Sequence, residues 1–184
     1  MQEQLNFQID HNIHLELTHH THAEGLFRSV DENRDHISKF LSWVDHMKTV
    51  EDTRNYIKTC TQLFNEGKEV SFVIIYAGKI AGRVGLHHIN NLDKNAAIGY
   101  WLTEEAIGKG IIINSCKKLI NYGFDVLGLN RIEIKVATQN FKSQAVPEKL
   151  NFVKEGILRQ AAIMNNDFLD LILYSALKKE WVNK

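Results

Sequence analysis

Apolar and polar positions along the chain switch between two spacings, which predicts a mixture of strands and helices. Apolar residues first alternate with polar ones from Ile13 to Leu17, as in a half-buried strand. Helical spacing follows, with a capping-box pattern from Thr21 to Glu24, a cap at Thr49 and a stop at Gly67. The first third is therefore expected to hold one strand over 13–17 and helices from the Thr21 cap through Val30, over 35–43 and over 50–65.

The rest of the chain alternates strands with two helices. The expected elements are a hairpin of strands over 70–76 and 79–89, a strand over 96–102, a helix over 110–126, a strand over 131–138, a helix, and strands over 152–159 and 168–177. The helix between the strands over 131–138 and 152–159 contains Pro147. Because proline is tolerated in the first turn of a helix and breaks its interior, this helix is expected to start near Ser143 or Gln144. Asn140 and Ser143 would then lie at its N-terminus. The order predicts an α+β fold: one domain over residues 1–184, with a mixed, mostly antiparallel sheet flanked by helices.

Composition narrows the class of protein. The 184 residues carry 22 basic and 22 acidic side chains, and this neutral balance argues against direct nucleic-acid binding. No apolar run approaches the ~18 residues of a membrane span, and the N-terminus lacks the pattern of a secretory signal, so no membrane association is expected. Cys60 and Cys116 fit buried thiols better than a disulfide framework. These features predict a cytoplasmic protein.

Residues 98–126 hold the strongest candidate for ligand binding. A short strand over Ile98–Leu102 is followed by Thr103, then by Gly108-Lys109-Gly110 and a long helix. A glycine turn at the start of a helix leaves backbone N–H groups free at the positive end of the helix dipole, which suits a phosphate group. The spacing matches neither the dinucleotide fingerprint nor the Walker loop. An ordinary turn is therefore the competing interpretation.

The ordered motifs of this chain resemble the GNAT superfamily of acyl-CoA-dependent N-acetyltransferases. More narrowly, they resemble its bacterial ribosomal-protein branch, which acetylates N-terminal serine or alanine. The matching segments, within about Ile9 to Trp181, are Trp43–Asp45, Gly82–His88, Ile98–Leu102, Gly108–Ile111, Leu129–Ile134, Asn140 with Ser143, Val146–Leu150 and Glu155–Arg159. The resemblance implies a GNAT fold with a V-shaped splay, in which the strand ending at Trp101-Leu102 carries a bulge and separates from the strand at Arg131. It also implies acetyl-CoA as cosubstrate, with no metal.

The resemblance also implies a site. Backbone N–H groups near Leu102 would point at the thioester carbonyl, and the loop from Glu105 to Gly110 would wrap the pyrophosphate. An amine attacks the thioester directly in a ternary complex, and Ser143 could protonate the leaving thiolate. A helix N-cap is the structural alternative for Ser143. The expected contacts of acetyl-CoA are Trp101, Leu102, Thr103, Gly108, Lys109, Gly110, Ile111, Asn140 and Ser143.

Two alanines depart from the pattern of the branch and leave the general base open. Ala162 stands where the branch commonly has a glutamate, and Ala97 stands where many relatives have an acidic residue. An enzyme without a strong base is better suited to an α-amine, of which about a tenth is neutral at pH 7, than to lysine. Candidate replacement bases are His87, His88, Glu133 and Glu155, each of which also fits a surface or packing role. Adjacent strand residues face opposite sides, so at most one of the two histidines can face the cleft.

Several groups have two interpretations. The cluster His19-His20-x-His22 lacks the spacing of a metal site, so none is expected. Residues 40–45 fit either acceptor contact or helix packing, and Trp181 fits either internal packing or the seam of a homo-oligomer.

Three functions remain open at this point. The first is acetylation of a protein N-terminus, as on a ribosomal protein. The second is acetylation of a small amine, such as a polyamine or an antibiotic-like compound. The third is acyl-CoA binding with little or no catalysis.

Overall fold

The computed structural model describes residues 5–164 and 166–181, and its strands and α-helices follow the predicted order with two additions, strand β1 and the short final helix α6. The strands are β1 (Asn6–Gln8), β2 (Ile13–Leu17), β3 (Val70–Tyr76), β4 (Lys79–Asn90), β5 (Asn95–Leu102), β6 (Arg131–Ala137), β7 (Val153–Met164) and β8 (Asp167–Leu177). The α-helices are α1 (Ala23–Asp31), α2 (Arg34–Ile37), α3 (Val50–Asn65), α4 (Ile111–Asp125), α5 (Phe141–Lys149) and α6 (Lys178–Trp181). Three 3₁₀ turns are η1 (His20–His22), η2 (Ser42–His46) and η3 (Glu104–Ala106).

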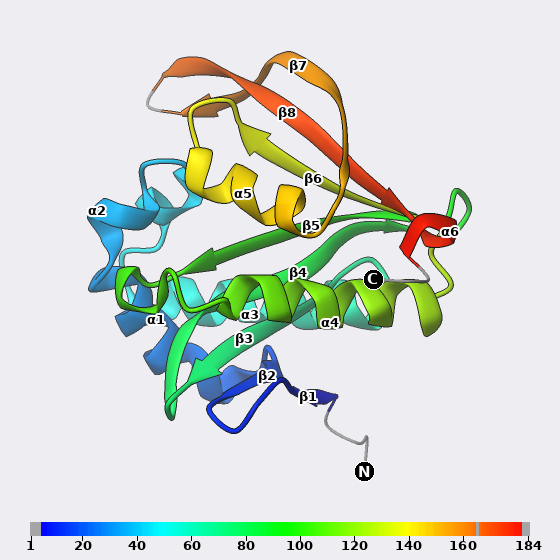
Figure 1. Cartoon of the computed structure of the whole chain (residues 1–184). Helices are drawn as coiled ribbons and strands as arrows, with labels where there is room; N and C mark the ends of the chain where they lie inside the picture. The colour runs from blue at the N-terminus through cyan, green and yellow to red at the C-terminus, as the bar shows by residue number, and fades with distance from the viewer. Residues whose placement is uncertain (1–4, 165, 182–184) are drawn as a thin grey trace.

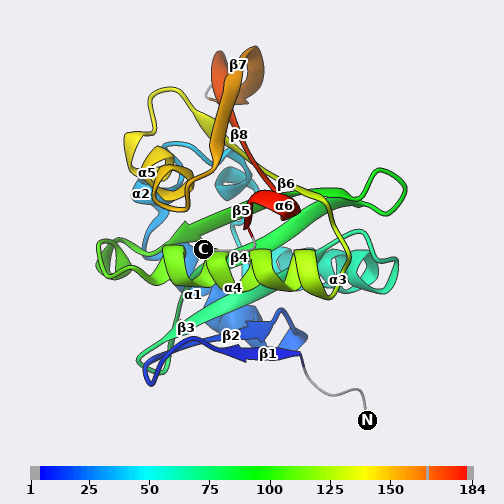
Figure 2. The same cartoon turned by 45° about the vertical axis from the view of Figure 1, so that its right-hand side comes forward.

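All eight strands form one twisted sheet in the order β1-β2-β3-β4-β5-β6-β8-β7. Helix α4 lies along one face of this sheet, whereas α1 and α3 cover the other (Figures 1 and 2). Two apolar cores result, because side chains alternate between the faces of each strand. Val84 and Leu86 belong to the core under α4, and Trp101 belongs to the core under α1 and α3.

The predicted V-shaped splay is present between the two parallel strands β5 and β6. Their pairing is limited to three positions, from Asn95 opposite Arg131 to Ala97 opposite Glu133. Both strands continue beyond this point, and each stays paired on its outer side, with β4 and β8 respectively. The strands therefore separate after Ala97, and α5 follows the far arm of the V (Figure 1).

Two predicted local features, a bulge in β5 and a helix over 35–43, differ from the structure. The bulge expected in the strand ending at Trp101-Leu102 is in its partner β4, where His88 and Ile89 both stand opposite Ala96 and His88 has φ of 53°. The expected helix over 35–43 is also wrong: α2 ends at Ile37 and η2 follows. The Arg34 guanidinium donates to the carbonyls of Val44 and Met47 at 2.7 Å, which folds this segment back on itself.

The capping box predicted from Thr21 does not form. The Thr21 hydroxyl instead lies 3.1 Å from Nδ1 of His19, and α1 begins after the turn η1. The Thr49 cap is confirmed, since its hydroxyl accepts the Asp52 N–H at 3.2 Å and the Asp52 carboxylate accepts the Thr49 N–H. Gly67 ends this helix with φ of 67°.

Helix α5 begins at Phe141, two residues before the predicted start, and contains Pro147 in its interior. A proline at this position removes the N–H that would bond to the carbonyl of Ser143. The Tyr100 hydroxyl donates to that carbonyl instead, at 3.0 Å. The Ser143 carbonyl therefore does not go unpaired, because β5 supplies the donor that the proline lacks, and the proline is accommodated.

Trp181 and the two cysteines all lie in the interior of the described chain. Trp181 is 6% exposed and packs against Phe124 and Phe152, so its packing is internal. Cys60 and Cys116 are both free and buried, as predicted. No helix in the described part of the chain is long and apolar enough to span a membrane.

Candidate active site

The first component of the site is the gap between the arms of the V. Residues 98–102 of β5 and 134–137 of β6 are strands without a partner on their facing sides. Their N–H and C=O groups are therefore open to an extended ligand, which can pair with a free strand edge as an added strand does. A linear pantetheine chain carrying amide groups fits such an edge.

The glycine loop lies at the open end of the V and leads directly into α4. Gly108 and Gly110 have φ of 81° and 74°, a region that glycine enters without the strain other residues incur. A Cβ atom added at Gly108 would meet nothing within 4 Å, so the loop borders open space. Among the described residues no side chain caps the N-terminus of α4, and its first N–H groups remain available. This arrangement fits a pyrophosphate group.

The other loop residues named from the sequence are placed as follows. The Thr103 N–H donates to the carbonyl of Ala81 at 2.8 Å, and the Thr103 side chain does not cap η3. The Lys109 ammonium lies 4.7 Å from the ring centroid of Tyr76. The Ile111 side chain is buried in the core, so its contact with a ligand would run through its N–H.

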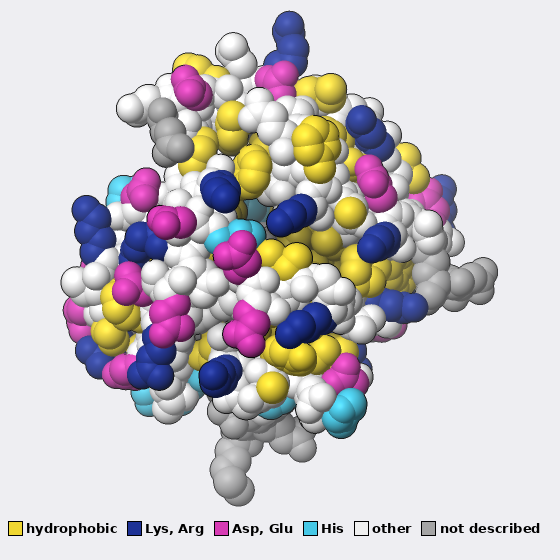
Figure 3. All heavy atoms as spheres, turned by 60° about the vertical axis from the view of Figure 1, so that its left-hand side comes forward, with side chains coloured by type: hydrophobic (Ala, Val, Ile, Leu, Met, Phe, Trp, Pro, Cys, Tyr) yellow, Lys and Arg dark blue, Asp and Glu magenta, His cyan; other side chains and the backbone are white. Residues whose placement is uncertain are grey.

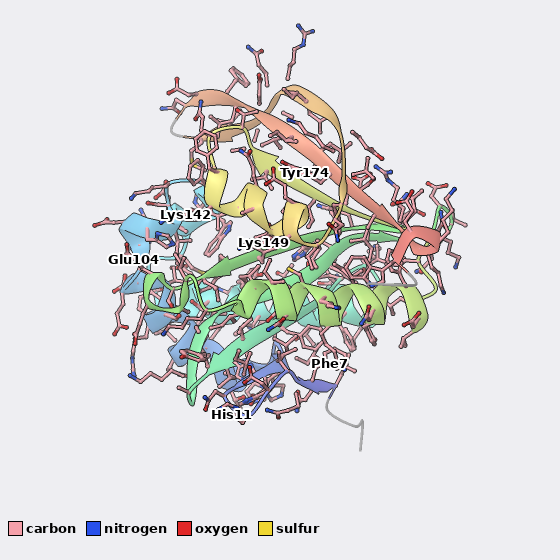
Figure 4. All side chains as sticks on the ribbon, viewed as in Figure 1. Phe7, His11, Glu104, Lys142, Lys149 and Tyr174 are labelled. Atoms are coloured by element: carbon pink, nitrogen blue, oxygen red, sulfur yellow. The ribbon has the colours of Figure 1, made fainter. Side chains whose placement is uncertain are left out.

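The next residue of this loop, Glu104, connects the loop to the helical cover. Its N–H donates to Oδ1 of Asn33 at 2.9 Å, across from the start of α2. In Figure 4, Glu104 and Lys142 of α5 lie on the same side of the molecule, where β5 ends and α4 begins. Both the loop and the helical cover therefore meet at the open end of the V.

Asn140 and Ser143 lie on the far arm. The Asn140 Oδ1 accepts the Ser143 N–H at 3.2 Å, which makes Asn140 the N-cap of α5. Ser143 is thus not the N-cap, and its hydroxyl has no hydrogen-bond partner among the described residues. The hydroxyl is available for a ligand, and its backbone carbonyl is held by Tyr100 from the opposite arm.

A cavity of about 360 Å³ opens on the other face of β4 and β5, under α1, η2 and α3. Its walls include the rings of Trp43, Tyr56 and Trp101, with the first and last 6.0 Å apart. Gly85 and Gly99 stand opposite each other on its floor, where absent side chains leave room. Figure 3 shows a hollow with apolar walls on this side of the molecule, bordered by side chains of both charges.

One acidic and two basic side chains line the cavity: Glu69, Arg83 and His87. Nδ1 of His87 lies 3.0 Å from one oxygen of Glu69, and the Arg83 guanidinium lies 3.9 Å from the other. Arg83 also sits 4.6 Å over the Tyr56 ring, and burial lowers its pKa to about 9. Burial opposes ionisation of Glu69, yet the hydrogen bond from His87 holds the pKa of Glu69 below its usual range.

The cavity also holds polar atoms that the protein leaves unpaired. In the described residues, Oε1 of Glu69, Nε of Arg83 and Nε1 of Trp101 are buried without a hydrogen-bond partner. Such atoms cost free energy unless a ligand or water satisfies them. The cavity therefore suits a molecule with polar groups.

Of the four candidate bases, only His87 lines this cavity. His88 is exposed at the bulge. Glu133 and Glu155 both bind Arg131, at 2.8 and 2.6 Å, on the sheet away from the cavity. The hydrogen bonds from Arg131 and Ser175 lower the pKa of Glu155 to about 2, so it cannot act as a base near neutral pH.

Residues 40–45 divide between the two roles considered from the sequence. Trp43 lines the cavity, whereas Val44 is fully buried in the core. Sequence reasoning missed Glu69, Arg83 and Tyr100. Arg83 carried a signal, because it is a charge within an otherwise apolar strand, but its partners come from other elements.

A family model described as an acetyltransferase (GNAT) domain matches residues 12–153. YdaF of Bacillus subtilis (strain 168) is 33% identical over 95% of this chain and 96% of its own length. The ribosomal-protein-serine acetyltransferase of Escherichia coli (strain K12) is 28% identical over 92% of this chain and 95% of its own length. A spermidine N(1)-acetyltransferase of the same strain is 31% identical over 59% of this chain and 58% of its own length.

Two solved structures share this fold over almost their full length. The ribosomal L7/L12 α-N-protein acetyltransferase RimL, in complex with coenzyme A, has a TM-score of 0.91 at 26% identity, covering 94% of this chain and 98% of its own. The microcin C7 self immunity acetyltransferase MccE, in complex with acetyl-CoA and AMP, has a TM-score of 0.88 at 31% identity, covering 92% and 94%.

Proposed function

The chain belongs to the acetyltransferase (GNAT) domain family and is an acetyl-CoA-dependent N-acetyltransferase, and we propose that its acceptor is the N-terminal α-amine of a protein, of the ribosomal type. Acetyl-CoA would lie in the V, with its pyrophosphate at Gly108–Gly110 and its pantetheine along β5. The amine would enter from the cavity under α1 and α3.

The observation that carries this proposal is the charge of the cavity. Among the described residues that line it, Glu69 is the one carboxylate, and it is already paired with His87 and close to Arg83. A polyamine carries several positive charges and would need several carboxylates to replace its hydration. A peptide N-terminus brings a single amine and backbone amides, which suit the unpaired polar atoms of the wall.

The ordinary acidity of the acceptor supports the same choice. A protein α-amine has a pKa of about 8, so roughly a tenth is neutral at pH 7, whereas lysine near 10.4 is neutral only to a few parts in ten thousand. A site with one paired carboxylate has limited means to deprotonate lysine. It suits an amine that already releases its proton near neutral pH.

Release of thiol from acetyl-CoA over an acceptor panel tests this function. The panel contains peptides that begin with serine or alanine, the same peptides with a blocked N-terminus and an internal lysine, spermidine, and an aminoacyl nucleotide. We expect turnover on the free peptides and little on the blocked ones. Faster turnover of spermidine would overturn the proposal, and tight CoA binding without any turnover would indicate a protein that binds acyl-CoA without catalysis.

A small-molecule amine is the second candidate, and the aromatic walls favour one that carries a flat ring. Trp43, Tyr56 and Trp101 surround the cavity together with the Arg83 guanidinium, which suits stacking of a base and pairing with a phosphate. The MccE structure, which holds AMP, makes an aminoacyl nucleotide the appropriate probe of this class. Turnover of that probe above the peptides would select this function.

A further inference from the structure

We infer that His87 is the general base that takes the proton from the acceptor amine, with Glu69 as the residue that positions it. This inference rests on the N-acetyltransferase function proposed above, and it holds for a peptide or a small amine alike. It assigns the proton acceptor that Ala97 and Ala162 leave open.

The position of His87 relative to the V is the first argument. His87 pairs directly with Ala97 across the β4–β5 ladder, and Ala97 is also the last residue of β5 that pairs with β6. The imidazole therefore stands one strand away from the point where the V begins. It also occupies the same sheet face as a carboxylate at position 97 would, since directly paired residues share a face.

The two glycines on the floor of the cavity explain the orientation of the ring. A Cβ atom at Gly85 would lie 3.0 Å from Nε2 of His87, and one at Gly99 would lie 3.4 Å from the same atom. A side chain at Gly85 would crowd the imidazole, and one at Gly99 would fill the space next to it. With glycine at both, the ring lies over the floor, and its Nε2 edge reaches toward Gly99 on β5.

Glu69 determines which nitrogen is available. Its Oε2 lies 3.0 Å from Nδ1 of His87, and the pairing of a carboxylate with Nδ1 favours the tautomer with the proton on that nitrogen. The lone pair then resides on Nε2, the atom nearest the glycine floor. Glu69 is 11% exposed at its side chain and stays charged, so it also stabilises the imidazolium once the proton has been accepted.

The other titratable side chains around the imidazole come from two elements. They are Arg83 on β4 and Tyr56 and Cys60 on α3. Tyr100 on β5 also borders the cavity, but its side chain lies on the opposite face of the sheet and donates to the carbonyl of Ser143. Burial raises the pKa of Cys60 to about 12, so its thiol stays protonated. Helix α1 and turn η2 contribute only apolar or tryptophan side chains to the cavity. No competing base faces His87 in the described part of the cavity.

The step balances without a further reactant. The neutral amine nitrogen attacks the thioester carbonyl carbon, the C–N bond forms, and one N–H proton passes to Nε2 of His87. The C–S bond then breaks, and the thiolate takes one proton, which Ser143 can supply. His87 then releases its proton to solvent, and Ser143 regains one proton from solvent, so both residues end in their starting states. The products are the amide and the free thiol of CoA.

His87→Gln and Glu69→Gln test the inference on whichever amine of the panel the wild type turns over, so a wrong acceptor class does not affect the result. The matched control is His88→Asn, since asparagine tolerates the left-handed backbone of that position. The shift of thermal midpoint with acetyl-CoA confirms that each variant folds and binds.

His87→Gln is expected to lower kcat by about 100-fold or more at pH 7, as for loss of a general base. The difference in kcat between wild type and His87→Gln should become smaller toward pH 9, where more of the amine is already neutral. Imidazole added to the solution should restore part of the activity of a His87→Ala variant. Glu69→Gln should lower kcat less, move the acidic limb of the pH profile, and leave the KM for acetyl-CoA unchanged. His87→Gln with more than half the activity from pH 6 to 9 would overturn the inference.

Discussion

The Tyr100 hydroxyl on β5 donates a hydrogen bond of 3.0 Å to the backbone carbonyl of Ser143 on α5. This bond joins the two arms of the V, and it satisfies the carbonyl that Pro147 leaves without a helical donor. Burial raises the pKa of Tyr100 well above its ordinary value, so the hydroxyl stays a donor at any moderate pH. The position of Ser143 therefore depends on a strand residue 43 positions earlier in the chain as well as on its own helix.

Tyr100→Phe should lower the free energy of unfolding by about 1 kcal/mol, because it leaves a partly buried carbonyl unpaired. Chemical denaturation measures this change. Pro147→Ala restores an N–H four residues after Ser143, which can pair with the same carbonyl. In the double variant the cost of Tyr100→Phe should therefore shrink, and equal costs in both backgrounds would contradict the role given to this bond.

Gly108→Ala should weaken binding of acetyl-CoA about tenfold or more. Alanine at φ of 81° is strained, and relaxation of the loop would turn away N–H groups whose charge-assisted bonds to phosphate contribute about 1.5 to 3 kcal/mol each. Isothermal titration measures the affinity. Gly128→Ala is the matched control, since Gly128 also has positive φ and nothing within 4 Å of an added Cβ. It should destabilise the fold similarly and leave the affinity unchanged. Unchanged affinity in Gly108→Glu would reject the pyrophosphate assignment.

Ser143→Ala should lower kcat by about 100-fold while the affinity for acetyl-CoA stays within twofold, if its hydroxyl protonates the leaving thiolate. Steady-state kinetics with the preferred amine give this comparison. Ser143→Thr keeps a hydroxyl and should recover much of the rate. Full activity in Ser143→Ala would contradict the role of Ser143 as the acid. Asn140 would then act only as the N-cap of α5.

Glu155→Gln should flatten the acid dependence of stability. The pKa of Glu155 is about 2 in the folded protein, against an ordinary value near 4.5, because Arg131 and Ser175 bond to the carboxylate. A depressed pKa contributes stability above about pH 4.5 that is lost as the pH falls toward 2. The carboxylate is 35% exposed, so solvent screening limits the contribution to about 1 kcal/mol or less.

Urea denaturation at pH 7, 4 and 3 measures this effect. The difference between wild type and Glu155→Gln should be greatest at pH 7 and fall toward pH 3. Glu32→Gln, at an exposed carboxylate at the end of α1, should show no such trend. A difference that grows as the pH falls would have the wrong sign for the Arg131 pair.

The strands and long helices were predictable because their signals are local. Alternation identified β2, apolar runs bounded by turn residues identified β3 through β6, and the Thr49 cap with Gly67 placed both ends of α3. The missed features depend on distant partners. Arg34 folds the segment after α2 by binding carbonyls ten and thirteen residues later, and Tyr100 permits Pro147 inside α5. Neither partner can be identified from spacing along the chain.

The sequence by itself determined the order of the strands and long helices, the glycine loop before α4 and the cap of α3, since turn residues and caps act within a few positions. Only the tertiary structure decided which side chains form the acceptor cavity. Glu69, Arg83 and His87 come from a loop and from one strand, and the sheet register places them under α3 and beside Trp101. The register of the sheet sets the face on which each side chain lies. The sequence named four candidate bases, and only the folded structure shows that His87 is the one in the cavity.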